Sequence, residues 1–214
     1  NKGDNMAKKR ISDVLIEVLA NAGIERIYGI TGDSLNSVND SLRRNGKIAF
    51  EHVRHEETAA FAAGAEASLT GKLTVCAGSS GPGNLHLING LFDCHRNRVP
   101  VLAIASHIPQ SEVGLNYFQE THPENLFKEC SCFCELVSNP KQMPEILFRA
   151  MNAAIGNQDV AVIVLPGDVA VMEMEIDELP VWNQPRLPHI VPQHDDIEEM
   201  AAHLEKGERI TLFC

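Results

Sequence analysis

The segment LTVCAGSSGPGNLHLINGLFDCHRNRVPVLAIAS, residues 73–106, decides the fold class. It begins with a short apolar run, passes through a glycine-rich turn into a helical pattern, and ends in a second apolar run. Apolar runs without polar alternation are typical of parallel strands that are covered on both faces. The segment therefore predicts a strand–helix–strand unit of an α/β protein.

The same alternation extends along the chain in both directions. Apolar strands are predicted at residues 26–30, 48–53, 73–78, 99–106 and 160–166. Helices are predicted at residues 11–23, 34–45, 56–71, 83–97, 123–138 and 143–157. We therefore expect a three-layer, doubly wound α/β fold, in which a mostly parallel sheet carries helices on both faces.

The regular pattern breaks after Asp168. Four prolines between residues 178 and 196 exclude a regular helix or a central strand, which indicates a linker. The expected organisation is a tail at 1–9, a main domain at 10–178, a linker at 179–194 and, at 195–214, the capped helix and strand that open another α/β unit. Because a lone strand cannot complete a sheet, we expect the chain to be part of a longer protein.

Composition narrows the class of partner. The 214 residues include 18 Lys and Arg against 29 Asp and Glu, a formal charge of -11, and the longest basic run is KKR at 8–10. This charge disfavours a nucleic acid and favours a small molecule. No apolar run approaches the roughly 20 residues of a membrane span, and no signal peptide is evident, so a cytoplasmic location is expected.

Cysteines offer no metal or disulfide signature. Six cysteines without a secretory signal indicate reduced thiols. Cys130, Cys132 and Cys134 are two residues apart, and on the helix predicted at 123–138 they would point in different directions. They are interpreted as small core residues.

A glycine-rich turn, Gly81-Pro82-Gly83-Asn84, follows the strand at 73–78. The turn lacks the third glycine of a dinucleotide fingerprint and the Gly-Lys-Ser/Thr of a phosphate loop. Two interpretations remain open: a tight turn with proline at the helix start, or a backbone wall that lies against a ligand.

Two other segments follow strands and could carry function. Gly32-Asp33-Ser34 is explained as a helix N-cap, or as part of a site, but it is too short to define a metal site. In the irregular segment 117–126, Phe118 and Gln119 place an aromatic ring beside an amide. Loops at the carboxyl ends of parallel strands often carry functional residues.

Two adjacent acids, Glu56 and Glu57, open a helical run made mostly of Ala and Gly. Either acid could complement the helix dipole, whereas a buried carboxylate is costly unless it is paired. Burial favours the protonated form of a carboxyl group, so a buried acid here could hold or share a proton.

Five segments taken together resemble the N-terminal pyrimidine-binding domain of thiamine-diphosphate-dependent enzymes. They are YGITGDSLN (28–36), RHEETAAFAAGAEA (54–67), SSGPGNLHLINGLFDCHRNRVPVLAIASH (79–107), YFQETHPENLF (117–127) and VIVLPGDV (162–169). Within these enzymes they most nearly resemble the pyruvate oxidases, and among them the quinone-linked bacterial pyruvate dehydrogenases. Acetolactate synthases share much of the same pattern.

The resemblance implies roles for individual residues. Glu56 matches the catalytic glutamate, which hydrogen-bonds N1' of the aminopyrimidine ring and so favours the tautomer that activates the thiazolium, while Glu57 has no catalytic role and is expected at a surface or interface. The small residues of this helix imply close packing at a subunit face. Cofactor-binding positions would be Glu56, Gly32, Asp33, Gly81, Pro82, Gly83 and Asn84, and substrate-contacting positions Phe118, Gln119 and His86.

The resemblance also implies an activity. Pyruvate would be oxidatively decarboxylated to acetate and CO2, with electrons passing through FAD to a quinone. In the family, a Gly-Asp-Gly motif followed by Asn in a C-terminal domain holds Mg²⁺ and the diphosphate, a middle domain binds FAD, and a C-terminal segment binds the membrane. No metal ligand is therefore expected in this chain, and the chain alone would be inactive. A cytoplasmic, membrane-peripheral homotetramer is implied.

Three other functions are compatible with parts of this pattern. Two are enzymatic: an acetolactate synthase-like carboligase and a phosphate-dependent pyruvate oxidase. The third is a non-catalytic interaction module, which is disfavoured because a binding module needs none of Glu56, Phe118 and Gln119.

Overall fold

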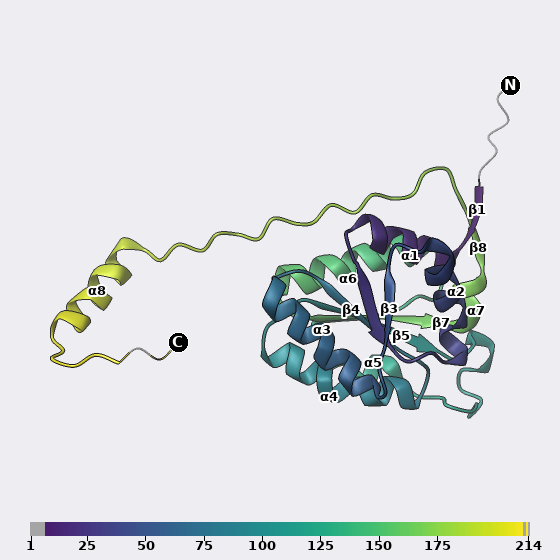
Figure 1. Ribbon diagram of the computed structural model, residues 1–214, viewed down its shortest axis with the longest axis horizontal. Helices are drawn as coiled ribbons and strands as arrows, with labels where there is room; N and C mark the ends of the chain where they lie inside the picture. Colours follow the sequence, from purple (N-terminus) through teal and green to yellow (C-terminus); the bar gives the residue numbers. More distant parts are fainter. Residues whose placement is uncertain (1–6, 212, 214) are drawn as a thin grey trace, which may run out of the picture.

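A single parallel sheet forms the centre of the molecule (Figure 1). The computed structural model describes residues 7–211 and 213. Within this part, six strands pair in parallel in the spatial order β3 (Ala49–His52), β2 (Arg26–Gly29), β4 (Thr74–Gly78), β5 (Val101–His107), β7 (Val160–Pro166) and β6 (Phe133–Leu136). The predicted α/β fold with helices on both faces of a mostly parallel sheet is confirmed.

Helices cover both faces of this sheet (Figure 1). On one face lie α1 (Ile11–Asn21), α2 (Asn36–Asn45) and α6 (Met143–Asn157), and on the other α3 (Glu56–Thr70) and α4 (Pro82–Arg96). Side chains alternate between the faces along each strand. On β5, Leu102 and Ile104 join the core under α1 and α6, whereas Ala103 and Ala105 join the core under α3 and α4.

Small residues bring α3 and α4 unusually close. A Cβ atom added to Gly90 would lie 2.6 Å from the Cβ of Ala60, and one added to Gly64 would lie 2.6 Å from the Sγ of Cys94. The Ala/Gly run of α3 therefore serves packing against α4 of the same chain. The resemblance led us to expect this close packing at a subunit face; the structure shows it within the chain.

The helix predicted at 123–138 is wrong. Only α5 (Pro123–Leu126) is helical there, and Phe133–Leu136 forms the edge strand β6. Phe127 and Cys130 have the spacing of a helical face and are both buried. Parallel pairing with β7, which begins with a hydrogen bond from the N–H of Cys132 to the carbonyl of Val160, overrides that local pattern.

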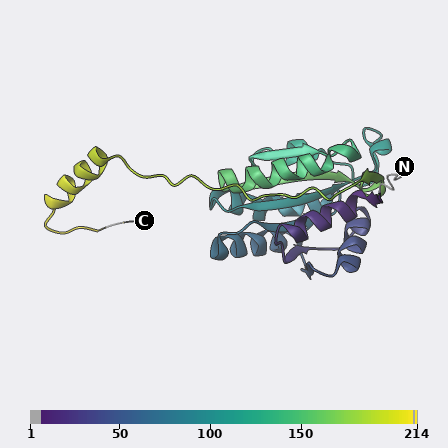
Figure 2. The ribbon, with the colours of Figure 1, turned by 90° about the horizontal axis from the view of Figure 1, so that it is seen from above.

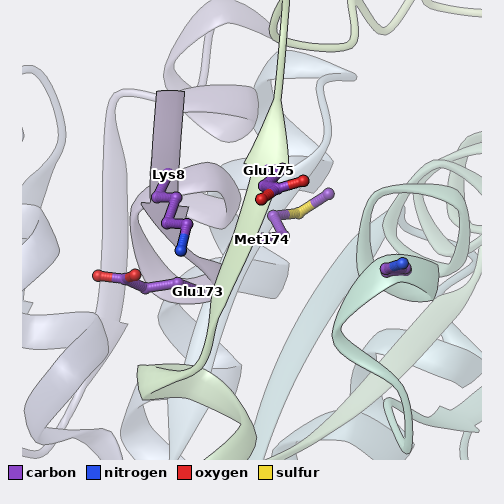
Figure 3. Close-up of a pocket in the computed structure, with 5 residues that line it drawn as sticks. Lys8, Glu173, Met174 and Glu175 are labelled. Carbon is purple, nitrogen blue, oxygen red and sulfur yellow. The ribbon is translucent and has the colours of Figure 1, made fainter. Parts of the chain in front are cut away.

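A second, two-stranded sheet was not predicted. The strand β1 (Ala7–Arg10) includes residues 7–9, which were expected to belong to a tail. It pairs antiparallel with β8 (Glu173–Ile176), and β8 follows the short helix α7 (Gly167–Val171). Figure 3 shows Lys8 of β1 beside Glu173, Met174 and Glu175 of β8, where an open cleft of about 600 Å³ lies. The remaining residues of the expected tail, 1–6, are outside the described part.

The C-terminal segment runs away from the sheet domain (Figure 2). The linker expected at 179–194 remains a prediction. Residues 177–193 contain no helix or strand, and His194 begins α8 (His194–Glu205), which buries no residue. The N-cap, Gln193, makes no side-chain capping bond, so the expected side-chain cap is not observed. Residues 206–211 and 213 form no strand, and residues 212 and 214 of the expected strand lie outside the described residues.

Among the helices that the structure describes, each is too short or too polar to span a membrane.

Candidate functional site

The carboxyl ends of β2, β4, β5 and β7 meet at one edge of the sheet. The chain passes from β2 to β3 on one side, and β4 lies on the other side of β2, so the order of strands reverses between β2 and β4. In open α/β sheets, ligands bind in the crevice at such a reversal. The two predicted turns, at Gly32-Asp33-Ser34 and Gly81-Pro82-Gly83-Asn84, both open onto it.

Serine hydroxyls connect the strand ends. Ser34, in the 3-10 helix η1 (Asp33–Leu35) after β2, accepts a hydrogen bond from the N–H of Ser80 at 2.9 Å, and its Oγ lies 2.9 Å from the Oγ of Ser79. Ser106 of β5 donates its hydroxyl to the carbonyl of Ser34 at 2.5 Å. Asn84, fully buried, donates to the carbonyl of Ser106 at 2.7 Å. The edge is thus held together by side chains from three strand ends.

The glycine-rich turn has the features of the first interpretation, a tight turn with proline at the helix start, and its glycines also allow close approach to other parts of the chain. Pro82 is the first residue of α4, and Gly81 has the positive φ of 67° that favours glycine. A Cβ on Gly81 would lie 2.8 Å from the carbonyl oxygen of Gln119, and one on Gly83 would lie 3.3 Å from Oε1 of Glu56. Within the chain, the turn therefore approaches two residues that sequence analysis singled out.

The N-cap interpretation of Gly32-Asp33-Ser34 is not supported. Gly32 occupies the cap position of η1, and neither η1 nor α2 is capped by a side-chain hydrogen bond. A Cβ on Gly32 would overlap the hydroxyl of Ser79. The glycine is required for close approach of the two turns.

Glu56 begins α3, and its side chain is only 12% exposed. Its Oε2 lies 3.1 Å from Nδ1 of His86 on α4. The His86 ring stacks on His55, with centroids 4.3 Å apart and planes 24° apart. His55 is the N-cap of α3, where its Nδ1 accepts the N–H of Glu57 at 3.2 Å. Glu57 is itself half-buried, so it only partly meets the expectation of a surface position.

Donor atoms of His55, Glu56 and His86 lie within 4.8 Å of one another, which raises the question of a metal site. Ligands of one zinc ion must direct their lone pairs toward a common point. Two stacked imidazole rings instead direct their lone pairs within nearly parallel planes. As arranged, the three residues form a hydrogen-bonded stack and not a coordination site.

A cavity of about 250 Å³ lies beside the serine network, on the strand edge. Its walls include Asp33, Ser34, Ser80, His107, Ile108, Pro109, Tyr117, Phe118, Gln119 and Gly167. Two of the expected substrate positions, Phe118 and Gln119, thus share one cavity. The third, His86, is not among its lining residues and pairs with Glu56.

The loop that carries these residues is held in a specific conformation. Phe118 is 77% exposed, and Gln119 adopts a positive φ of 65°, which is uncommon for a residue other than glycine. The Oε1 atom of Gln119 accepts the hydroxyl of Ser80 at 3.3 Å. Glu120 accepts the N–H groups of Gly114 and Tyr117, which lowers the pKa of its carboxyl group.

His107, at the end of β5, was not predicted as a site residue. It is 4% exposed, and its Nδ1 has no hydrogen-bond partner within the described part of the chain. Burial lowers the pKa of its imidazole, so the ring is held neutral. Ser80 and His55 were also missed. His107 ends β5, Ser80 lies between β4 and α4, and His55 immediately precedes α3, and these positions at strand ends and helix starts are the signal that could have identified them.

Asp168 directly follows Gly167, which lines the cavity. Both of its carboxylate oxygens lie 3.1 Å from the N–H of Gln110, and Oδ1 also accepts the N–H of Val169. This acid therefore anchors the segment after β5 to the turn after β7.

Comparisons with known proteins show the family of the chain. The family model for the N-terminal TPP binding domain of thiamine pyrophosphate enzymes matches residues 9–126 of this chain. The uncharacterized 42.6 kDa protein in the isoamylase 3' region of Pseudomonas amyloderamosa is 58% identical over 210 residues, which cover 98% of this chain and 53% of that protein.

Two relatives of named activity are similar at comparable levels. Pyruvate oxidase of Lactiplantibacillus plantarum is 38% identical over 156 residues, covering 72% of this chain and 26% of that protein. Acetolactate synthase of Arthrospira platensis is 35% identical over 181 residues, covering 82% of this chain and 31% of that protein. The chain thus spans between about a quarter and about half of these relatives. It belongs to the thiamine pyrophosphate enzyme family, in which it corresponds to the N-terminal TPP-binding domain.

Proposed function

We propose that this chain holds the aminopyrimidine ring of thiamine diphosphate, with Glu56 as the ring's hydrogen-bond partner. The observation that carries the proposal is the environment of Glu56. Its carboxyl group is largely buried, Oε2 is paired with His86, and Oε1 lies 3.3 Å from the position that a Cβ of Gly83 would take, so the glycine keeps the turn clear of the carboxyl group. The residues present therefore fit the cofactor.

Each residue of the site has a distinct task in this proposal. Bound thiamine diphosphate supplies the nucleophilic carbon and the electron sink for cleavage beside a carbonyl group. Glu56 holds or donates a proton at the pyrimidine nitrogen. The two turns, Gly32-Asp33 and Gly81-Pro82-Gly83-Asn84, would border the ring, since their glycines keep the backbone close to the crevice.

The substrate that we propose is pyruvate. The cavity of about 250 Å³ suits a small molecule, and the rim of Phe118 and Gln119 offers an apolar ring and an amide. The similarity to the pyruvate oxidase of Lactiplantibacillus plantarum supports this choice. The complete enzyme would convert pyruvate to acetate and CO2, pass electrons through FAD to a quinone, use Mg²⁺, and act as a homotetramer that associates peripherally with the inner face of the cell membrane.

A carboligase that forms acetolactate is the second candidate, because the acetolactate synthase relative is 35% identical and the pyruvate oxidase 38% identical. A phosphate-dependent pyruvate oxidase would catalyse a variant of the first candidate reaction, the oxidative decarboxylation of pyruvate.

Product analysis separates these candidates. The complete enzyme would be supplied with thiamine diphosphate, Mg²⁺, FAD and pyruvate, with an artificial dye as electron acceptor. Acetate and reduced dye without added phosphate are the expected products. Acetolactate as sole product would establish the carboligase, and a strict need for phosphate would establish the phosphate-dependent oxidase.

A further inference from the structure

The two carboxylate oxygens of Glu56 face different surroundings. Oε2 is 3.1 Å from Nδ1 of His86, whereas Oε1 lies on the side of Gly83, 3.3 Å from the position of an added Cβ. A carboxyl group in this setting can accept a proton at one oxygen while it gives up a proton from the other. Glu56 is thus placed between His86 and the glycine turn.

His86 connects this buried acid to solvent. The Glu56 side chain is 12% exposed and the His86 side chain 47% exposed, so water reaches the imidazole far more readily than the carboxyl group. Oε2 can only accept a hydrogen bond, both in the carboxylate and in the acid that carries its proton on Oε1, so in the neutral imidazole Nδ1 carries the hydrogen and Nε2 carries the lone pair. The ring therefore has one nitrogen for Glu56 and one for water.

His55 restrains the ring of His86. The two rings stack at 4.3 Å, and His55 is in turn anchored by the N–H of Glu57. This anchoring originates in α3, whereas His86 belongs to α4. The position of the imidazole is thus defined by both helices.

We propose that His86 is a positioning residue that relays protons between solvent and Glu56. Its Nδ1 proton passes to Oε2 as the proton on Oε1 passes to the ligand beside Gly83, and Nε2 takes a proton from water. One proton enters and one leaves, with no change of oxidation state. The inference rests on the proposed function, and it assigns His86 to Glu56 and not to substrate.

The first test requires no cofactor. Nitrogen-15 NMR of histidine-labelled chain reports which ring nitrogen carries the hydrogen. We expect the Nδ1–H form for neutral His86 and its loss in Glu56→Ala. The matched control is His95, on the same helix, whose Nδ1 lies 2.8 Å from Oδ1 of Asp159 and which should keep its form in that variant. An Nε2–H form of His86 in the unmodified chain overturns the proposal.

The second test uses the complete enzyme with thiamine diphosphate and measures hydrogen–deuterium exchange at the reactive carbon of the cofactor by acid quench and NMR. His86→Ala should slow exchange on the order of 10²-fold, the lower range for a positioned acid or base. Imidazole added to the buffer should restore part of the rate, because the position is open to solvent. His95→Ala should leave the rate unchanged.

The outcomes separate this inference from the proposed function. If the unmodified enzyme exchanges no faster than free cofactor, the proposed function fails. If it exchanges rapidly and His86→Ala does the same, only the relay fails. A slow His86→Ala variant that imidazole does not restore shows a structural role and also overturns the relay.

Discussion

The hydroxyl oxygens of Ser34 and Ser79 lie 2.9 Å apart, although 45 positions separate the two residues in the sequence. Ser34 follows β2 and Ser79 follows β4, the two strands between which the strand order reverses. The contact therefore joins the two turns that border the crevice. A Cβ on Gly83 would lie 3.3 Å from both Glu56 and Ser79, and Ser34 lines the cavity that Phe118 also lines.

Ser34→Ala should destabilise the chain by about 1–3 kcal/mol. The variant removes the acceptor of the Ser80 N–H, which would be left without its partner in a half-buried position. Urea unfolding at neutral pH measures the free energy. Ser111→Ala, at an exposed serine, is the matched control and should stay within about 0.5 kcal/mol. Equal effects in the two variants would contradict the role given to Ser34.

Gly90→Ala should destabilise the chain by about 1–3 kcal/mol or more. The new methyl group would meet Ala60 at 2.6 Å and the carbonyl of Glu57 at 2.8 Å, so α3 and α4 would have to separate. The same substitution at Gly156 of α6, which has nothing within 4 Å, should stabilise by up to about 1 kcal/mol. Thermal or chemical unfolding of both variants checks the contrast; a stable Gly90→Ala variant would show that the helices are not in close contact.

Glu56→Gln should lower thiamine-dependent turnover of the complete enzyme by about 10²–10⁴-fold, because the amide cannot hold and release a proton as the carboxyl group does. The fold should survive, since glutamine has nearly the same shape. Glu57→Gln is the matched control, because it changes the adjacent acid, to which no role in the site is assigned. This variant should keep most activity. Turnover and unfolding temperature are both measured. Wild-type rates in Glu56→Gln would exclude the assigned role.

Stability should fall as the pH drops from about 7 to 5, in part through His107. Burial lowers the pKa of the folded imidazole below its ordinary value of 6.5. The neutral ring thus stabilises the fold fully above the unfolded pKa, and this contribution is lost as the pH falls from about 6.5 through the folded pKa. His107→Gln should flatten the dependence, whereas His52→Gln, at an exposed histidine of β3, should not. Urea unfolding across this pH range provides the comparison; identical slopes would refute the prediction.

Cys132 should be alkylated before the other described cysteines. Burial raises the pKa of Cys94, Cys130 and Cys134 to about 12, and that of fully buried Cys76 also rises, so few thiolates form near pH 8. Burial of its thiol raises the pKa of Cys132 as well, but the residue is exposed. Iodoacetamide labelling followed by peptide mass spectrometry identifies the order, with urea-unfolded chain as the control in which all should react. Early labelling of Cys130 would be inconsistent with the structure.

Strands buried on both faces could be predicted because their apolar runs are short, uninterrupted and bounded by turns. The strands at β4, β5 and β7 match the expectation to within two residues. The strand β6 could not be predicted, since Phe127 and Cys130 repeat at helical spacing and only pairing with β7 selects the extended conformation. The same holds for β1 and β8, which are short and mutually dependent.

By itself, the sequence determined the α/β class and the chemistry available at the strand ends, because periodicity and residue types act locally. It also brought Glu56, Phe118 and Gln119 into consideration through family resemblance. Only the tertiary structure decided that His86 faces Glu56 and lies outside the cavity of Phe118 and Gln119. The physical reason is that this pairing spans 30 residues and depends on how closely α3 approaches α4, which packing at Gly90 and Gly64 sets.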